Sequence, residues 1–237
     1  MADLGASPFT ISTTANYTIP PWVTSLQVEC YGGGATGRDG YPSGYGGGGG
    51  GGGAYSKRNA MPVTPGNSYT FTVGATAVFD DPGVNGNQST VTGDLGVVCT
   101  AVGGATPASD ITRGIGGAAG SCVGDVKYSG GNGGWGGNGA GGGGGGEGAW
   151  SGGDGNVGSN SSGPWNGGAG GTGTAGGDGG RGGNTGTNAG VAPGVTPGGG
   201  GGGSGIGDFN SPAGNGAAGR IIVTYTANTN SFVLEGN

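Results

Sequence analysis

Residues 129–150 read SGGNGGWGGNGAGGGGGGEGAW, and a residue other than glycine returns there at every third position. The phase of this repeat is kept across the all-glycine run 141–146. After an irregular break at 151–165 the same period returns between Asn166 and Thr187, shifted by one residue. Neither an α-helix nor a β-strand has a three-residue period, whereas the left-handed polyproline-II-type helix has three residues per turn.

A helix of this kind has no internal hydrogen bonds, so its amides need partners in water or in neighbouring chain segments. Glycine on two of the three helix edges lets neighbouring backbones approach closely enough to bond laterally. The repeat therefore predicts several antiparallel polyglycine-II helices packed side by side within one chain. The third-position residues would line the outer faces of this bundle.

Two other interpretations compete. Collagen has the same period but needs one glycine per triplet and abundant proline, whereas the regular triplets here have two glycines and no proline. A flexible linker is compatible with the composition alone, because glycine loses the most backbone entropy on folding. The regular phase, the three tryptophans and the strand-like segments on both sides favour an ordered body.

The composition limits the functions open to the chain. Its 237 residues include 73 glycines, and only 31% are hydrophobic, so backbone hydrogen bonding must replace an ordinary apolar core in much of the molecule. The net charge of −6, with seven basic residues, argues against nucleic acid as a partner and against an electrostatic membrane anchor. We see no apolar run of membrane-spanning length and no signal sequence, so we expect no membrane insertion.

The three cysteines show neither metal-binding nor disulfide-framework spacing. Cys30 shares the alternating face of Leu26 and Val28, which predicts a buried free thiol. A bridge between Cys99 and Cys122 stays open. These features together indicate synthesis in a reducing cytoplasm.

Short strand-like segments flank the glycine blocks. They are predicted at 9–11, 17–19, 25–31, 54–58, 61–63, 68–73, 89–92, 97–102 and 220–226. The last of these must pair with an earlier strand, because an isolated strand is not stable. Residues 231–234 would be an extra edge strand, a segment donated to a partner subunit or a frayed terminus.

We therefore expect an all-β fold with essentially no α-helix, in two parts. Residues 1–102 and 220–237 would form a small antiparallel β-sandwich, with a glycine-rich insertion at 32–53. Residues 103–219 would form the polyglycine-II helical bundle.

The order of these segments is similar to that of a known family. The matching segments are YTIP (17–20), VTSLQVECYGGG (23–34), the glycines 46–53, AYSK (54–57), VTPGNSYTFTVG (63–74) and GNGAAGRIIVTY (214–225). They resemble a glycine-rich domain of tail fibre and receptor-binding proteins of tailed bacteriophages, and the resemblance covers nearly the whole chain. The chain departs from the usual setting of that domain, because it has no long fibrous shaft, β-helical spike or obvious attachment module.

The resemblance implies a virion structural protein, made in the host cytoplasm and released by lysis. Its implied partners are other virion proteins, copies of itself, and a bacterial surface glycan or outer-membrane protein. It also implies that loop tips at the end of a polyglycine-II bundle choose the receptor. Because the usual shaft is missing, a separate small tip or decorating protein is the expected arrangement.

No residue pattern indicates an active site. The chain has no histidine, which removes the usual proton shuttle and metal ligand. Asp80 and Asp81 stand beside Pro82-Gly83, a sequence typical of a turn. The many glycine patterns lack the strand-to-helix context of a nucleotide-binding loop. We expect no enzymatic activity, no catalytic residue, no cofactor and no metal.

The aromatic residues are the better candidates for a binding site. Trp135, Trp150 and Trp165 are spaced fifteen residues apart, and with Tyr128 they form the predicted receptor-contact set. In an unbroken helix Trp135 and Trp150 would share a face, whereas regular chain reversals would gather all three tryptophans near one end of the bundle. Exposed tryptophan suits stacking on sugars or packing on a receptor loop. The alternative is that these rings cap the bundle or seal it against the sandwich.

The resulting hypothesis is a non-enzymatic virion adhesin, in which a rigid bundle presents variable loops to a host surface. A capsid or tail decoration protein with a purely structural role is one alternative. An ice-binding protein is another, although Asp178 and Arg181 interrupt the row of alanines and threonines that a flat, uncharged face would need.

Overall fold

A computed structural model describes residues 2–4, 6–40, 44–80, 83–137, 141–162, 166–173, 175–184, 192–206 and 212–226. The strands are β1 (Ala2–Asp3), β2 (Phe9–Ile11), β3 (Ala15–Thr18), β4 (Ser25–Tyr31), β5 (Tyr55–Pro62), β6 (Ser68–Thr72), β7 (Ser89–Gly93), β8 (Gly96–Ala101), β9 (Val126–Tyr128) and β10 (Arg220–Thr224). Apart from a 3-10 turn, η1 (Ala119–Ser121), these described residues contain no helix. The all-β prediction is confirmed.

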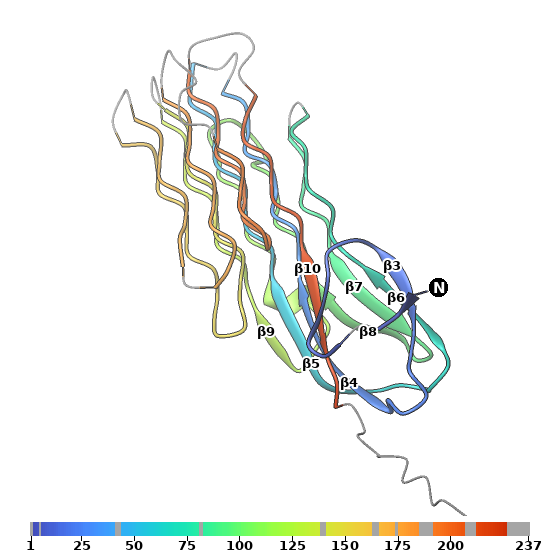
Figure 1. The fold of residues 1–237 in the computed structure, drawn as a ribbon. Coiled ribbons are helices and arrows are strands. Elements are labelled where there is room, and N and C mark those ends of the chain that lie inside the picture. Colours follow the sequence, from blue (N-terminus) through green and yellow to red (C-terminus); the bar gives the residue numbers. More distant parts are fainter. Residues whose placement is uncertain are drawn as a thin grey trace, which may run out of the picture.

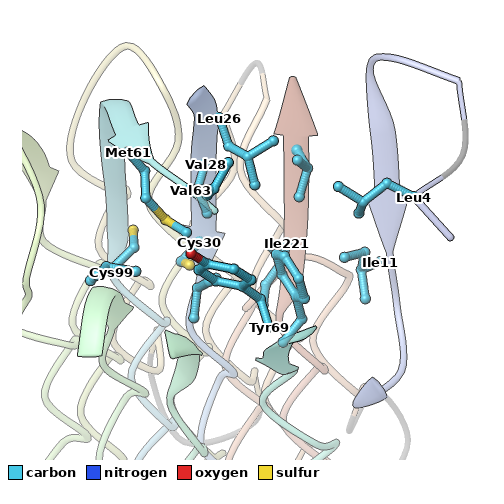
Figure 2. Packing of buried hydrophobic residues seen from close by; sticks show 14 of the residues in the cluster. Leu4, Ile11, Leu26, Val28, Cys30, Met61, Val63, Tyr69, Cys99 and Ile221 are labelled. Carbon is cyan, nitrogen blue, oxygen red and sulfur yellow. The ribbon is translucent and has the colours of Figure 1, made fainter. Parts of the chain in front are cut away.

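Two five-stranded sheets form a sandwich at one end of the molecule (Figure 1). Their strand orders are β1-β3-β6-β7-β8 and β2-β10-β4-β5-β9, and every pairing is antiparallel except that of β1 with β3. Along β4, Leu26, Val28 and Cys30 are buried, as their alternation predicts. They pack with side chains of the facing sheet, among them Phe71 and, as Figure 2 shows, Tyr69. This is the main apolar core.

Most predicted strands are confirmed, and the exceptions follow from pairing. β10 pairs with both β2 and β4, so the last strand closes the sandwich as expected. The separate strands predicted at 54–58 and 61–63 are wrong, because both belong to the single strand β5. A register shift between Leu26 and Val28 of β4 lets the two strands pair along this whole length. Strand β9 was not predicted, and the tail segment 231–234 lies outside the described residues.

The three cysteines are all free and buried. The expectation of a free thiol at Cys30 is thereby confirmed, and burial raises the pKa of this thiol well above its ordinary value. The bridge that the sequence left open between Cys99 and Cys122 is not formed.

The sandwich strands continue into the bundle without losing register. Tyr31 of β4 pairs with Tyr55 of β5, and the next bond runs from the N–H of Gly32 to the carbonyl of Ala54 at 2.9 Å. The same pairing then recurs every third residue, from Ala35 to Gly51. The β4–β10 and β7–β8 ladders extend in the same way, through the bonds Gly34 to Ala217 and Gly86 to Gly104. The β-ladders therefore set the register of the bundle.

Three glycine runs, 46–53, 141–146 and 198–203, lie at the centre of the bundle and bond to one another. The N–H of Gly50 donates to Gly201, that of Gly146 donates to Gly50, and that of Gly200 donates to Gly146, all at 2.8–2.9 Å. Each run is fully buried. Bonding at every third residue, with successive residues turned to different neighbours, is the pattern of polyglycine-II packing.

Burial on all edges explains why these runs contain only glycine. A Cβ atom at three successive positions of the second run would lie 1.9–2.0 Å from carbonyl oxygens of three different neighbours. These pairs are Gly144 with Ala169, Gly145 with Gly200, and Gly146 with Gly131. A peripheral helix has one edge without a neighbour, so every third position accepts a side chain. Continuous glycine thus marks an inner helix, and the three-residue repeat marks an outer one.

The sequence predicted antiparallel helices only, whereas neighbouring helices in the bundle run both antiparallel and parallel. Chain reversals make consecutive helices antiparallel, as in the bonds from Gly131 to Glu147 and from Gly134 to Gly144. Helices that are not consecutive also pack in parallel, as in Gly143 to Gly47 and Gly146 to Gly50. Both directions are possible because lateral bonding requires only a free N–H facing a carbonyl.

Asparagine and aspartate at the periphery replace a missing neighbour. Oδ1 of Asn160 accepts the backbone N–H of Trp135 at 2.9 Å, and Oδ1 of Asn132 accepts that of Gly116 at 2.9 Å. Asn85, Asp154, Asp178, Asn184 and Asn215 make equivalent contacts. These short side chains satisfy outward-facing amides that no backbone carbonyl reaches.

The glycine-rich segment 32–53, predicted as an insertion in the sandwich, packs within the bundle, since 46–53 is one of the inner helices. The bundle therefore contains the segment between β4 and β5 as well as the long segment that follows β8.

Candidate functional site

Five pairs of described helix ends lie together at the end of the bundle farthest from the sandwich (Figure 1), and a short connection joins each pair in the sequence. The register of the flanking helices places them there, because Gly46 bonds to Gly137, Gly142 to Gly183, and Gly47 to Ser204. The connections are residues 41–43, 138–140, 163–165, 185–191 and 207–211, and all five lie outside the described residues. We call this end the tip.

The sequences of these connections differ from that of the bundle. They contain the aromatic residues Tyr41, Trp165 and Phe209, together with asparagine, threonine, serine and one aspartate. Trp165 is therefore the one member of the predicted contact set that lies outside the described residues. Its flanking residues, Ser162 and Asn166, pair with each other next to the tip.

Trp135 lies on the side of the bundle near the tip, in a groove of about 520 Å³. The groove is lined by Ala105, Thr106, Ala108, Thr112, Arg113, Ile115 and Trp135, and we call it the Arg113 groove. Trp135 is 42% exposed and Ile115 is 53% exposed, so two large apolar side chains face solvent here. An open, mostly apolar groove with one charged group is a common form of ligand site.

Arg113 stacks on Trp135, with its guanidinium carbon 5.8 Å from the ring centroid. Within the described residues the Arg113 side chain has no ion pair and no hydrogen bond. A stacked guanidinium keeps its N–H donors on the rim of its plane, where they can bind an anion.

The segment that carries Arg113 is fixed on both sides. Arg38 donates to Asp110 at 2.6 Å, in a pair whose side chains are about one-fifth exposed, and to the carbonyl of Pro107 at 3.2 Å. Gly133 donates to Gly114 at 2.9 Å, which holds the helix of Trp135 against this segment. The spacing of Arg113 and Trp135 is therefore set by the backbone lattice.

Trp150 and Tyr128 lie at the other end of the bundle, beside the sandwich. Trp150 begins a tight turn to Gly153, and its ring folds over Gly152, where an added Cβ would come within 2.4 Å of it. Tyr128 stacks on Tyr55 with ring centroids 6.1 Å apart. Both residues thus lie at the end of the bundle next to the sandwich, away from the tip.

Trp135 and Trp150 do not lie at the same end of the bundle. The bonds from Gly131 to Glu147 and from Gly134 to Gly144 place Trp150 opposite residue 128. Trp135 lies seven residues further along (128 to 135), or about 20 Å at ~3.1 Å per residue. The expectation that chain reversals bring all three rings together is wrong, because the antiparallel pairing of 131–134 with 144–147 and the turn after Trp150 leave Trp135 and Trp150 near opposite ends of their helices.

Sequence reasoning found Trp135 but missed Arg113 and Ile115. The stretch Thr112-Arg-Gly-Ile115 has no distinctive spacing, and only the fold brings it beside Trp135. Among the described residues there is no cluster of three or more potential metal ligands, and no helix long and apolar enough to cross a bilayer.

This architecture corresponds to a known protein family. The sequence profile described as "Glycine-rich domain" matches residues 10–226. The chain belongs to the glycine-rich domain family. The match spans both the sandwich and the bundle, so the family's domain is the combined unit and not the glycine segments alone. No curated protein matches the chain.

Proposed function

We propose that this glycine-rich domain is a non-enzymatic adhesin of a virion, which contacts a bacterial cell surface through the tip of its bundle. One observation carries this proposal: five pairs of described helix ends lie together at the end of a backbone-bonded bundle, opposite the sandwich, and the sequences that join them contain Tyr41, Trp165 and Phe209. Binding residues are commonly carried by loops that a rigid scaffold positions.

The bundle suits such a role because its stability does not depend on the connections. Backbone amides join the inner and outer helices. Substitutions in the connections therefore leave these hydrogen bonds in place. Recognition residues at the tip can therefore vary while the platform stays constant.

The sandwich offers a separate surface for attachment. Its far end carries Trp22 at 55% exposure, in the turn before β4, and Leu95 at 76% exposure, in the β7–β8 turn. Exposed apolar groups at loop ends favour contact with another protein. We propose that this end binds other virion proteins or further copies of the chain. The virion setting rests on the resemblance to bacteriophage tail fibre domains.

The test compares two variants of the purified, fluorescently labelled protein on a panel of bacterial strains. The tip variant carries Tyr41→Ser, Trp165→Ser and Phe209→Ser, and we expect it to lose cell binding while its melting temperature is unchanged. The control variant carries Trp22→Ser, Leu95→Ser and Val97→Ser at the opposite end, and should bind cells as the unmodified protein does. Retained cell binding by the tip variant would reject the adhesive role of the tip.

A further inference from the structure

We propose that the Arg113 groove binds an acidic saccharide, that is, a sugar ring bearing a carboxylate. The inference deepens the proposed contact with a cell surface and rests on that function for its biological setting. Its physical basis is separate, because the groove lies on the side of the bundle and the residues that carry the argument are all described.

The charge of the groove selects an anion. Arg113 is the one charged residue among the described residues that line it, in a chain whose net charge is −6. The nearby acid, Asp110, is already paired with Arg38 at 2.6 Å. A guanidinium without a carboxylate partner among the described residues is a ready site for a planar carboxylate, which it can bind through two parallel hydrogen bonds.

The groove is also organised before the ligand arrives. Stacking on Trp135 holds the guanidinium, and the bond between Gly133 and Gly114 holds the two backbones that carry the pair. Because the receptor groups are already ordered, little side-chain entropy is lost on binding.

The walls favour the C–H face of a sugar ring. Ala105, Ala108 and Ile115 offer only apolar surface, and the ring of Trp135 continues it. The two threonine hydroxyls are already engaged, since Thr112 donates to the carbonyl of Ser109 at 2.8 Å and Thr106 donates to that of Thr36 at 3.2 Å.

The threonines therefore offer a ligand no free O–H donor, and most hydroxyls of the ligand stay in water. An open groove permits this, whereas an enclosed pocket would not. A pyranose ring with one carboxylate matches the arrangement, because it has an apolar face, a hydrated edge and a single charge. The volume of about 520 Å³ falls within the range of about 300–1,000 Å³ typical of ligand sites.

The test uses the full chain and titration calorimetry with trigalacturonic acid. Neutral maltotriose, of equal length, and phenylacetate, a small apolar anion, serve as comparison probes. We expect trigalacturonic acid to bind at least about ten-fold more tightly than maltotriose, since a charge-assisted hydrogen bond contributes enough for that factor. We also expect its affinity to fall with added salt.

Variants then locate the site. Arg113→Gln should weaken trigalacturonic acid binding at least about ten-fold, and Arg113→Lys less, because lysine lacks the planar fork. Trp135→Ala should weaken it as well. Arg181→Gln, which removes an exposed arginine from another outer helix, is the matched control and should leave the affinity unchanged.

Two results would overturn the inference: equal affinity for the acidic and neutral trisaccharides, or no trigalacturonic acid binding. The second includes the case in which phenylacetate binds and Arg113→Gln abolishes that binding. If the tip variant loses cell binding and the groove binds no acidic sugar, the proposed function stands and this inference falls. If the groove binds trigalacturonic acid and the tip variant still binds cells, the inference stands and the tip proposal falls.

Discussion

The backbone N–H of Gly146 donates a 2.9 Å hydrogen bond to the carbonyl oxygen of Gly50, between two glycine runs that are far apart in the sequence. Neither residue has a side chain, and both are buried. The centre of the bundle is therefore made of peptide groups, where the sandwich has an apolar core. The stability of the bundle accordingly depends on close backbone approach and on complete pairing of amides.

A single methyl group at the centre should disrupt the bundle. In Gly50→Ala the new Cβ would lie 2.3 Å from the carbonyl oxygen of Ala35, and no flexible side chain can yield. We expect a loss of at least about 4 kcal/mol of unfolding free energy or a failure to fold, measured by chemical denaturation. Gly120→Ala is the control, because a Cβ there meets no atom within 4 Å and should change stability by about 1 kcal/mol or less. Equal stability of the two variants would contradict the close backbone packing described for the bundle.

Side chains at the periphery should contribute through their hydrogen bonds. Asn160→Ala removes the acceptor for the Trp135 amide, and we expect it to cost about 0.5–1.5 kcal/mol in denaturation experiments. Asn160→Asp keeps an acceptor and should restore most of this loss. Val157→Ala, at an exposed third position of the same helix, should change stability by no more than about 0.5 kcal/mol. An equal change in stability for Asn160→Ala and Val157→Ala would show that water satisfies the Trp135 amide when the Asn160 side chain is removed.

Hydrogen exchange should separate inner from outer helices. The runs 46–53 and 141–146 are buried, and apart from Gly48 and Gly141 each of their amides donates to a backbone carbonyl of a described residue, so these amides should exchange as slowly as those of β4. Peripheral amides held by side chains, such as that of Trp135, should exchange faster. Mass spectrometry on proteolytic fragments gives the required resolution. Coil-like exchange across the inner runs would be incompatible with this packing.

Alkaline pH should weaken the junction between sandwich and bundle. Burial, and then the charge of Glu29, raise the pKa of Tyr55 and Tyr31, and both hydroxyls donate to Glu29. A raised folded-state pKa contributes stability that is complete below the unfolded tyrosine pKa of about 10 and is lost as pH rises further. The melting temperature should therefore be level between pH 7 and 9 and fall above about pH 10.

The Tyr55→Phe variant tests this cause. It should be less stable at pH 7, by about 1 kcal/mol for the lost hydrogen bond, and its melting temperature should fall less steeply above pH 10. Val223→Ala, a core substitution in β10, should lower stability without altering the alkaline slope. Parallel curves for Tyr55→Phe and the unmodified protein would show that other groups cause the alkaline loss.

Local sequence patterns were sufficient for the elements with a clear period. The alternation at Ser25–Tyr31 predicted β4 with its bounds, and Val97–Val102 predicted β8 to within one residue. The three-residue repeat predicted lateral bonding of glycine helices. Strand β9 was missed because its three residues stand inside the glycine-rich stretch assigned to the bundle, and the break in β5 was predicted because Asn59 and Ala60 interrupt its apolar pattern.

The candidate site was less predictable. Trp135 stood out as a large aromatic residue among glycines, but the same signal also marked Trp150, whose ring folds onto its own turn. Arg113 gave no signal, since its role depends on a neighbour on another helix.

The sequence by itself determined the conformation of each segment: continuous glycine for helices enclosed on every edge, a side chain at each third position for helices at the surface, and alternation for strands. Only the tertiary structure decided which helices are neighbours, how they are aligned and where Arg113 meets Trp135. The physical reason is that lateral amide bonds are chemically alike for every glycine helix. The choice among partners is made by the β-ladder registers and the chain reversals, which act between segments distant in sequence.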